Sequence, residues 1–267
     1  MRDTELKKIT LETVELVKVV AAFIREQLGR VTADDISDKG VNSLVSYVDR
    51  ESEKRLVEGL RQITPSAVFL TEENTVAPES GSLKWIIDPL DGTTNFLHRV
   101  PIFAISAGLE YEGKMVVGVV CELMREEYFY AWKGGGAFLN GDKLAVSKTS
   151  RPFDACICIG FPAVEGPLYR HTLHLLSSFL PTTRGVRNLG AAAVEMAYVA
   201  CGRFDAFIEL GLAPWDVSAG CLLIEEAGGR VSDIEGKDDY IYGKSILASN
   251  GRLHESLREA AVLPSDC

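Results

Sequence analysis

The pattern of apolar positions predicts different elements in the two halves of the chain. Near the N-terminus, apolar residues recur at helical spacing and Gly29 ends the helix; they are Leu6, Ile9, Leu16, Val20, Ile24 and Leu28. A second helix is predicted from about Asp49 to Leu60. Apolar runs over 67–70, 85–87, 103–111, 115–123 and 127–132 indicate strands, and Glu112-Gly113 marks a hairpin. The first half therefore predicts two helices and an antiparallel sheet.

After about residue 150, predicted strands alternate with predicted helices. The strands are expected over 155–159, 183–186, 205–210, near Val231 and over 245–248, and the helices over 169–179, 190–200, 215–227 and at the C-terminus. Such alternation favours an α/β layer. We expect an N-terminal half over 1–150, a C-terminal half over 151–267, and a site in the crevice between them.

Composition and charge exclude several classes of protein. The 267 residues include 28 Lys and Arg against 38 Asp and Glu, a net charge of −10, which disfavours direct binding to nucleic acid. The sequence contains no run of 18 apolar residues, so it predicts no membrane span. It has no apolar segment near Met1 of the kind found in secretory signals, so we expect a cytoplasmic protein. The six cysteines form no CxxC pair, which favours reduced thiols.

The most informative segment is WIIDPLDGTTNF, residues 85–96. A hydrophobic strand leads into two acids three positions apart, and the Pro and Gly between and after them predict a turn that brings Asp88 and Asp91 together. Thr93 and Thr94 resemble a helix start whose N–H groups can meet an anion. Neighbouring carboxylates repel unless a proton or a hard cation such as Mg²⁺ intervenes. The alternative is a plain turn with an Asp helix cap.

Three further acidic points follow other predicted elements. Glu72 and Glu73 follow the strand over 67–70, where a solvated strand end is the alternative. Asp49 and Asp216 lie at expected helix starts, where an N-cap is the alternative. Together with the 85–96 segment, these acids could assemble a carboxylate cage that holds several metal ions around a phosphate.

Two of these segments resemble the signature motifs of the inositol monophosphatase family. They are DPLDGTTN at 88–95 and WDVSAG at 215–220, and the resemblance extends from Lys39-Gly40 to Gly228-Gly229. TEE at 71–73 and GFP at 160–162 are most similar to the bacterial branch that includes the extragenic suppressor proteins. The resemblance implies a layered α-β-α-β-α sandwich with two sheet-containing halves. It also implies a homodimer and lithium-sensitive, Mg²⁺-dependent hydrolysis of small phosphate monoesters.

The resemblance also implies a role for each acid, with two or three Mg²⁺ ions in each active site. Glu72, Asp88 and the carbonyl of Leu90 would hold the first ion, and Asp88, Asp91 and Asp216 the second. Asp49 and Thr93, with Glu72, would form the catalytic set that orients and activates water. The N–H groups of Gly92 and Thr93 would bind the phosphate.

Substrate contacts are implied at fewer positions, each with an alternative. Glu209 matches the family residue that binds a sugar or inositol hydroxyl, although it could be a strand-end acid. Gly190 and Ala192 match a substrate-contacting turn, although they could be the start of an Ala-rich helix. Arg187 could face a second phosphate or a subunit interface.

Three positions depart from the family pattern, and one of them is Ser46, which stands where relatives commonly carry Thr. Phe161 stands where animal enzymes carry a substrate-contacting Ser, which puts inositol 1-phosphate in question as substrate. Ser43 stands where relatives commonly carry Asp. None of the three changes removes an acid from the expected metal cage.

Three functions follow as hypotheses. The first is a Mg²⁺-dependent phosphatase for a polyol or sugar phosphate, with inositol 1-phosphate ahead of fructose 1,6-bisphosphate and histidinol phosphate. The second is a phosphatase for 3′-phosphoadenosine 5′-phosphate. The third is a regulatory protein that binds a protein partner in transcription or RNA processing, since relatives in the suppressor branch are linked to such complexes. Neither a Cys-x5-Arg loop nor a nucleotide-binding P-loop is present.

Overall fold

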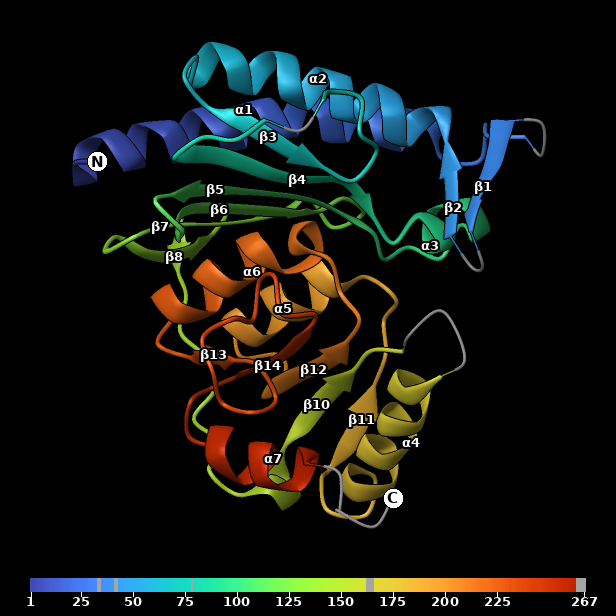
Figure 1. Cartoon of the computed structure of the whole chain (residues 1–267), viewed down its shortest axis with the longest axis vertical. Helices are drawn as coiled ribbons and strands as arrows, with labels where there is room; N and C mark the ends of the chain where they lie inside the picture. Colours follow the sequence, from blue (N-terminus) through green and yellow to red (C-terminus); the bar gives the residue numbers. More distant parts are fainter. Residues whose placement is uncertain (33–34, 41–42, 78, 162–165, 263–267) are drawn as a thin grey trace.

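Five layers stack along the long axis of the molecule (Figure 1). The computed structural model describes residues 1–32, 35–40, 43–77, 79–161 and 166–262, with the backbone alone for 36–40 and 43–44. An outer helix pair covers a large sheet, two buried helices follow, and a small sheet is covered by two more helices (Figure 1). The predicted α-β-α-β-α sandwich is confirmed.

The outer layer consists of α1 (Asp3–Gln27) and α2 (Tyr47–Ile63). The buried side of α1 carries most of the apolar residues that predicted it, together with Thr10 and Thr13. α2 begins two residues before the predicted start, because the hydroxyl of Ser46 accepts a hydrogen bond from the Val48 N–H (3.1 Å) and caps the helix. A short hairpin of β1 (Ile36–Gly40) and β2 (Ser43–Ser46) precedes α2 and was not predicted.

Within the described residues, the large sheet contains seven strands in sequence order. They are β3 (Val68–Thr71), β4 (Leu83–Asp91), β5 (Ala104–Tyr111), β6 (Lys114–Glu122), β7 (Glu127–Trp132), β8 (Gly136–Leu139) and β9 (Asp142–Lys143). The expectation of a purely antiparallel sheet is wrong at one edge, because β3 and β4 are parallel. β8 and β9 were not predicted, since they are short and lack an alternating apolar pattern.

The central layer contains α5 (Ala192–Ala200) and α6 (Pro214–Glu226). Every residue of α5 is buried, because the helices lie between the two sheets and meet apolar side chains on both sides. Their core includes Ile86 of the large sheet and Phe207 of the small one. This core joins residues from both predicted halves of the chain. The division into two halves at residue 150 stays a prediction.

The small sheet has the strand order β11-β10-β12-β14-β13. Its strands are β10 (Cys156–Ile159), β11 (Gly185–Arg187), β12 (Ala206–Leu210), β13 (Arg230–Ser232) and β14 (Ser245–Ser249). β10 runs parallel to β11 and β12, whereas β14 is antiparallel to β12 and β13. α4 (Pro167–Phe179) and α7 (His254–Ala261) cover the outer face (Figure 1). A 3₁₀ turn over Pro152–Asp154 leads into this half.

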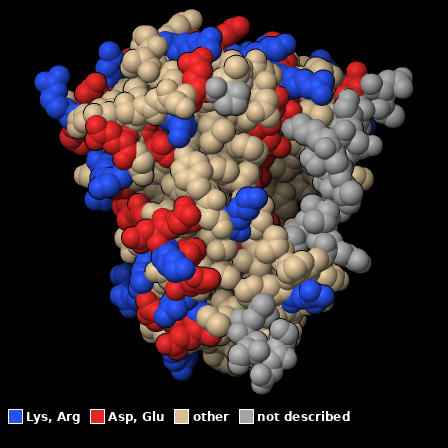
Figure 2. Space-filling view, in the orientation of Figure 1, with Lys and Arg blue, Asp and Glu red and all other residues tan. Residues whose placement is uncertain are grey.

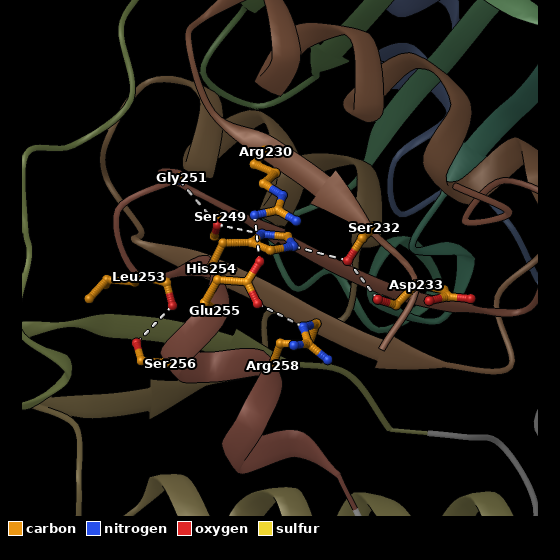
Figure 3. A network of polar contacts seen from close by, with 10 residues as sticks. All are labelled: Arg230, Ser232, Asp233, Ser249, Gly251, Leu253, His254, Glu255, Ser256 and Arg258. Carbon is orange, nitrogen blue, oxygen red and sulfur yellow. Dashed lines mark hydrogen bonds and ion pairs between the residues drawn. The ribbon is translucent and has the colours of Figure 1, made fainter. Parts of the chain in front are cut away.

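A buried histidine attaches α7 to the small sheet (Figure 3). The hydroxyl oxygens of Ser232 and Ser249 lie 2.9 Å from Nε2 and Nδ1 of His254. Ser232 donates its own proton to the carbonyl of Asp233, so its oxygen accepts from Nε2–H, while Ser249 donates to Nδ1. Burial, followed by the charge of Arg230, lowers the pKa of His254 to about 4. The ring is therefore neutral and has a partner at each nitrogen.

In the part of the chain that the structure describes, no helix is both long and apolar enough to cross a membrane. The five cysteines in that part are free thiols.

Candidate metal centre and substrate cavity

Parallel pairing at the edge of the large sheet brings Glu72 beside Asp88. Thr71 is paired with Ile87, and the Glu72 N–H donates to the Ile87 carbonyl at 3.2 Å. The residues that follow this pair along the two chains are Glu72 and Asp88. Burial, followed by the charge of Glu72, raises the pKa of Asp88 well above its ordinary value, and a hydrogen bond between the two carboxyl groups adds to this. The two acids therefore lie side by side where β3 ends along β4.

A β-bulge, rather than the predicted turn, brings Asp91 to the same place as Asp88. Asp88 is paired with Ser106 and Asp91 with Ala104, so β4 contains one residue more than β5 between these pairs. Asp88 Oδ1 accepts the N–H of Leu90 at 2.9 Å within the bulge. The chain turns only at Gly92, which has a φ of +84° and precedes α3 (Thr93–His98). The predicted helix start at Thr93 is confirmed.

Asp49 is not the N-cap of α2, although that was the alternative considered. It is the third helical residue, and its Oδ2 accepts hydrogen bonds from the N–H and hydroxyl of Ser46 at 2.9 and 2.7 Å. Its Oδ1 accepts a hydrogen bond from the hydroxyl of Thr93 at 2.9 Å. The same hydroxyl lies 3.0 Å from the carbonyl of Leu90. Asp49 thus binds the start of α2 through Oδ2 and Thr93 of the site through Oδ1.

Asp216 repeats this arrangement at the start of α6. It is again the third residue of the helix and accepts the Ala213 N–H on Oδ2 at 2.7 Å, so the N-cap alternative is wrong here too. Asp91 Oδ2 accepts the Ala193 N–H from the start of α5 at 2.8 Å. These bonds leave Oδ1 of Asp91 and Oδ1 of Asp216 without a hydrogen-bond donor among the described residues. Both are therefore available to a ligand.

The four acids Glu72, Asp88, Asp91 and Asp216, which we call the carboxylate cluster, influence one another electrostatically. Burial, followed by the charge of Asp216, raises the pKa of Asp91 well above its ordinary value. Burial likewise raises the pKa of Asp216 to about 7, against the lowering effect of the Ala213 N–H. Mutual repulsion of buried carboxylates is relieved by a proton or a cation.

The donor set of the carboxylate cluster fits a hard divalent cation. Carboxylate oxygens are the ligands that Mg²⁺ takes in proteins, and carboxylates are the groups that this cluster offers. A softer metal would favour histidine or thiolate ligands instead. In the described part of the chain, no three acidic, His or Cys side chains already stand in a ready coordination geometry. The arrangement thus supplies charge and donor atoms, while the coordination shell itself stays a prediction.

A cavity of about 330 Å³ adjoins the carboxylate cluster. Figure 2 shows the surface hollowed on the right of the view, between the sheets, with acidic atoms on its wall; β4 ends and α3 begins on this side (Figure 1). Six predicted site residues line the cavity, namely Asp91, Phe161, Gly190, Ala192, Glu209 and Asp216. Four others line it that were not predicted, namely Asn188, Ala191, Glu195 and Leu212.

Glu209 reaches the cavity because Gly160 has no side chain. A Cβ atom at Gly160 would lie 1.9 Å from the Glu209 carboxyl group, so only glycine allows this packing. Burial, followed by the charge of Glu195, raises the pKa of Glu209 well above its ordinary value. The family resemblance implied Glu209, whereas the close packing with Gly160 could be found only in three dimensions.

Glu195 is a buried acid of the cavity wall that sequence reasoning missed. Its carboxylate accepts the N–H of Leu189, and burial raises its pKa to about 7 despite hydrogen bonds from the 189–190 backbone. A signal was present, because Glu195 is the single acid in the otherwise apolar helix 192–200. A charged residue on an all-buried helix indicates a polar partner.

Asn95, the last residue of the DPLDGTTN motif, ties the metal side of the site to the cavity side. Its amide donates to the carbonyls of Ile102 and Leu189, both at 2.8 Å. Gly190 follows with a φ of +76°, and a Cβ there would lie 3.2 Å from the Asn95 amide. The motif therefore fixes the turn before α5 as well as the acids.

The remaining predicted residues lie at the margin. Phe161 is exposed at the edge of the cavity. Arg187 is exposed, and its guanidinium donates to the Val186 carbonyl at 2.8 Å, which decides neither of its two proposed roles. The side chain of Ser43, and Pro162 of the GFP segment, lie outside the described residues.

Comparisons with known proteins agree with this geometry. The model of the inositol monophosphatase family matches residues 5–263. An inositol-1-monophosphatase of Mesorhizobium japonicum is 40% identical over 242 residues, covering 90% of this chain and 91% of that protein. The Nus factor SuhB of Pseudomonas aeruginosa is 38% identical over 240 residues, covering 88% of this chain and 89% of that one. The crystal structure of extragenic suppressor protein suhB from Bartonella henselae matches with a TM-score of 0.90 and 37% identity, over 95% of this chain and 98% of that chain.

Proposed function

The chain belongs to the inositol monophosphatase family, and we propose that it is a Mg²⁺-dependent phosphomonoesterase for a small polyol or sugar phosphate. The observation that carries the proposal is the carboxylate cluster beside an acid-lined cavity. Mutually repelling carboxylates at the mouth of a cavity disfavour an anionic ester unless cations stand between them. Once cations are bound, the same carboxylates hold them beside the phosphate and so favour binding of the ester.

Glu72, Asp88 and the Leu90 carbonyl, with Asp91 and Asp216, are the groups that would hold two or three Mg²⁺ ions. The bound cations supply charge neutralisation of the phosphate, a lowered pKa for water and stabilisation of the leaving oxygen. The free Oδ1 atoms of Asp91 and Asp216 are open to such a role, because backbone N–H groups hold the opposite oxygen of each carboxylate. This bonding also fixes the direction in which each free oxygen points.

Asp49 and Thr93 would orient the attacking water. The Thr93 hydroxyl has one proton and two acceptors within 3.0 Å, Asp49 Oδ1 and the Leu90 carbonyl. With that proton directed at either acceptor, the lone pairs of Thr93 Oγ1 are free to accept a hydrogen bond from water. A proton that water releases can pass through Thr93 Oγ1 to Asp49 Oδ1.

The start of α3 would bind the phosphate. Gly92 and Thr93 begin the helix, where the first N–H groups have no partner within the helix. Gly92 has a left-handed conformation, and a Cβ there would lie 3.2 Å from the Gly190 carbonyl, so this helix start packs closely against the turn before α5. Phosphate oxygens and helix N-termini are complementary in charge.

Glu209 would accept hydrogen bonds from substrate hydroxyls, with Gly190, Ala192 and Phe161 along the same wall. A carboxylate that hydrogen-bonds to hydroxyl groups favours a polyol ester over an aryl ester as the substrate. We therefore place inositol 1-phosphate first among the substrates. Fructose 1,6-bisphosphate, histidinol phosphate and 3′-phosphoadenosine 5′-phosphate are the alternatives.

The testing experiment is phosphate release from these four esters and p-nitrophenyl phosphate, with and without Mg²⁺. EDTA and Li⁺ serve as controls. We expect release that requires Mg²⁺, is inhibited by Li⁺ and is fastest with inositol 1-phosphate. A different ranking would replace the substrate and keep the phosphatase. A folded, Mg²⁺-loaded chain that releases phosphate from none of the esters would overturn the proposal.

A second candidate function is protein binding in transcription, favoured by the relative named Nus factor SuhB. Asp88→Asn separates the two, because it weakens the metal site without altering the outer surface. Co-purification of transcription proteins with both wild type and Asp88→Asn would support a separate binding role. The expected homodimer stays a prediction, which light scattering on the purified chain checks.

A further inference from the structure

Glu53 is a fully buried acid on α2, one helical turn after Asp49. Its Oε1 accepts hydrogen bonds from the hydroxyls of Thr71 (2.9 Å) and Thr75 (2.6 Å) and from the Thr75 N–H (2.7 Å). Its Oε2 accepts the Glu73 N–H at 2.7 Å. All four donors come from residues 71–75, which we call the Glu72 segment.

The bonding of Glu53 compensates its burial with donors from one segment. A buried carboxylate is costly unless hydrogen bonds replace its hydration, and hydrogen bonds to a charged group are stronger than neutral ones. Here two hydroxyls and two backbone N–H groups surround the carboxylate. Because the donors flank Glu72 on both sides, their bonds fix the backbone from which the Glu72 side chain extends.

α2 thereby anchors two parts of the site at once. Asp49 binds the Thr93 hydroxyl, and Glu53, four residues later on the same face of the helix, binds the Glu72 segment. β3 ends at Thr71, and just beyond it the Glu72 N–H donates to the Ile87 carbonyl of the sheet. Beyond the strand, Glu53 accepts three more hydrogen bonds, from the N–H groups of Glu73 and Thr75 and from the Thr75 hydroxyl.

We propose that Glu53 is a positioning residue that holds Glu72 at the cation site while itself touching neither substrate nor cation. This inference rests on the proposed function, because it assumes that the carboxylate cluster binds Mg²⁺. It differs from a purely structural role in one respect. Loss of Glu53 should weaken cation binding through Glu72 and through no other acid.

The test is Mg²⁺ binding to the purified full chain, measured by titration calorimetry for wild type and Glu53→Gln. The amide nitrogen of Gln cannot accept a hydrogen bond, so at least one of the four is lost. Removing an outer partner of a metal ligand typically weakens binding roughly 10–100-fold, and we expect a change in this range. Glu226→Gln is the matched control, because Glu226 is also a helical glutamate and accepts two loop N–H groups, of Gly134 and Gly136, at 2.8 Å each.

A double variant decides whether the effect passes through Glu72. If it does, Glu53→Gln combined with Glu72→Gln binds Mg²⁺ no more weakly than Glu72→Gln alone. Additive losses would overturn the inference, as would unchanged binding by a folded Glu53→Gln. Thr75→Val tests the same bonds with Glu53 intact if Glu53→Gln fails to fold, and there we expect a severalfold loss. A wild type that binds no Mg²⁺ would instead overturn the proposed function.

Discussion

The carboxylate cluster and the group of His254, Ser232 and Ser249, which we call the His254 cluster, both bury titratable side chains. They differ in how those side chains are compensated. His254 is neutral, and each ring nitrogen has a serine partner at 2.9 Å (Figure 3). In the carboxylate cluster, burial and like charge raise the pKa of Asp88 and Asp91 together, and Oδ1 of Asp91 has no donor among the described residues. One cluster is complete within the chain, and the other requires a proton or a cation from outside.

This difference distinguishes a structural polar cluster from a functional one. Buried polar groups that satisfy one another fix the packing of the elements that carry them, as His254 attaches α7 to β13 and β14. Buried like charges cost stability in the cation-free chain, and that cost persists only where the charges serve a ligand. Glu53 belongs to the first kind, although it lies next to the second.

The largest expected effect comes from Asp91→Asn. Asn retains an oxygen that can accept the Ala193 N–H, so the fold should survive, but the charge is lost. We expect Mg²⁺-dependent phosphate release to fall on the order of a thousandfold, about 4 kcal/mol of transition-state stabilisation. Steady-state phosphate release measures this, with circular dichroism to check folding. Comparable activity at ordinary Mg²⁺ would show that the carboxylate cluster is not the metal site.

His254→Ala should have the opposite profile. It removes a ring that is fully buried and leaves two serine hydroxyls without their partner, so we expect a loss of about 3 kcal/mol in the free energy of unfolding. Urea denaturation measures the loss. Mg²⁺ affinity should stay within about twofold of wild type, because the His254 cluster joins elements of the small sheet. A marked loss of Mg²⁺ affinity would remove the contrast between the two clusters.

The two clusters should also respond to pH with opposite signs. Folding raises the pKa of Asp216 to about 7, so between its ordinary value and pH 7 the native state binds more protons and stability falls as pH rises. Folding lowers the pKa of His254 to about 4, so between pH 4 and 6.5 the unfolded state binds more protons and stability rises with pH. In EDTA at pH 8, Asp216→Asn should therefore unfold at higher urea than wild type.

The advantage of Asp216→Asn should disappear below about pH 4, where the wild-type acid is protonated in both states. Saturating Mg²⁺ should reverse it, because the cation stabilises the wild-type site. Urea midpoints measured from pH 4 to pH 8, with EDTA and with Mg²⁺, check both statements. A lower midpoint for Asp216→Asn than for wild type in EDTA at pH 8 would contradict them.

The smallest effect concerns the wall of the cavity. Glu209→Gln should lower kcat/KM for inositol 1-phosphate about tenfold, because a charged acceptor of a hydroxyl is lost, and should change p-nitrophenyl phosphate turnover little. Gly160→Ala should give a similar selective loss, since its Cβ displaces the Glu209 carboxyl group. Kinetics on both substrates measure this. Equal losses on both substrates would show that Glu209 does not read hydroxyls.

Much of the site could be predicted from the sequence because its acids occur in short, specific motifs. DPLDGTTN and WDVSAG contain Asp88, Asp91 and Asp216, and Glu209 stands at a fixed distance before the second motif. Glu195 and Glu53 could not be assigned in this way, because each stands alone in a helix with no motif around it. Their importance lies in what faces them, which depends on elements far away in the chain.

Two local expectations were wrong, each for a different reason. The Asp88–Asp91 segment was expected to turn, but pairing with β5 keeps it in the sheet as a bulge. Asp49 and Asp216 were considered as N-caps, but each is the third residue of its helix and bonds back to the preceding turn. Pairing with a distant strand decided the first case, whereas a hydrogen bond to the backbone N–H three residues earlier decided the second.

By itself, the sequence determined the order of the longer helices and strands and the identity of the four acids of the carboxylate cluster, because hydrophobic periodicity and short motifs are local properties. The tertiary structure decided which acids share one site. The parallel register of β3 and β4 sets Glu72 beside Asp88, and the packing of α5 and α6 against the large sheet brings Asp216 to Asp91. It also decided that His254 is satisfied while the carboxylates are not. Compensation of a buried charge depends on every group around it, and those groups come from residues that are distant in the sequence.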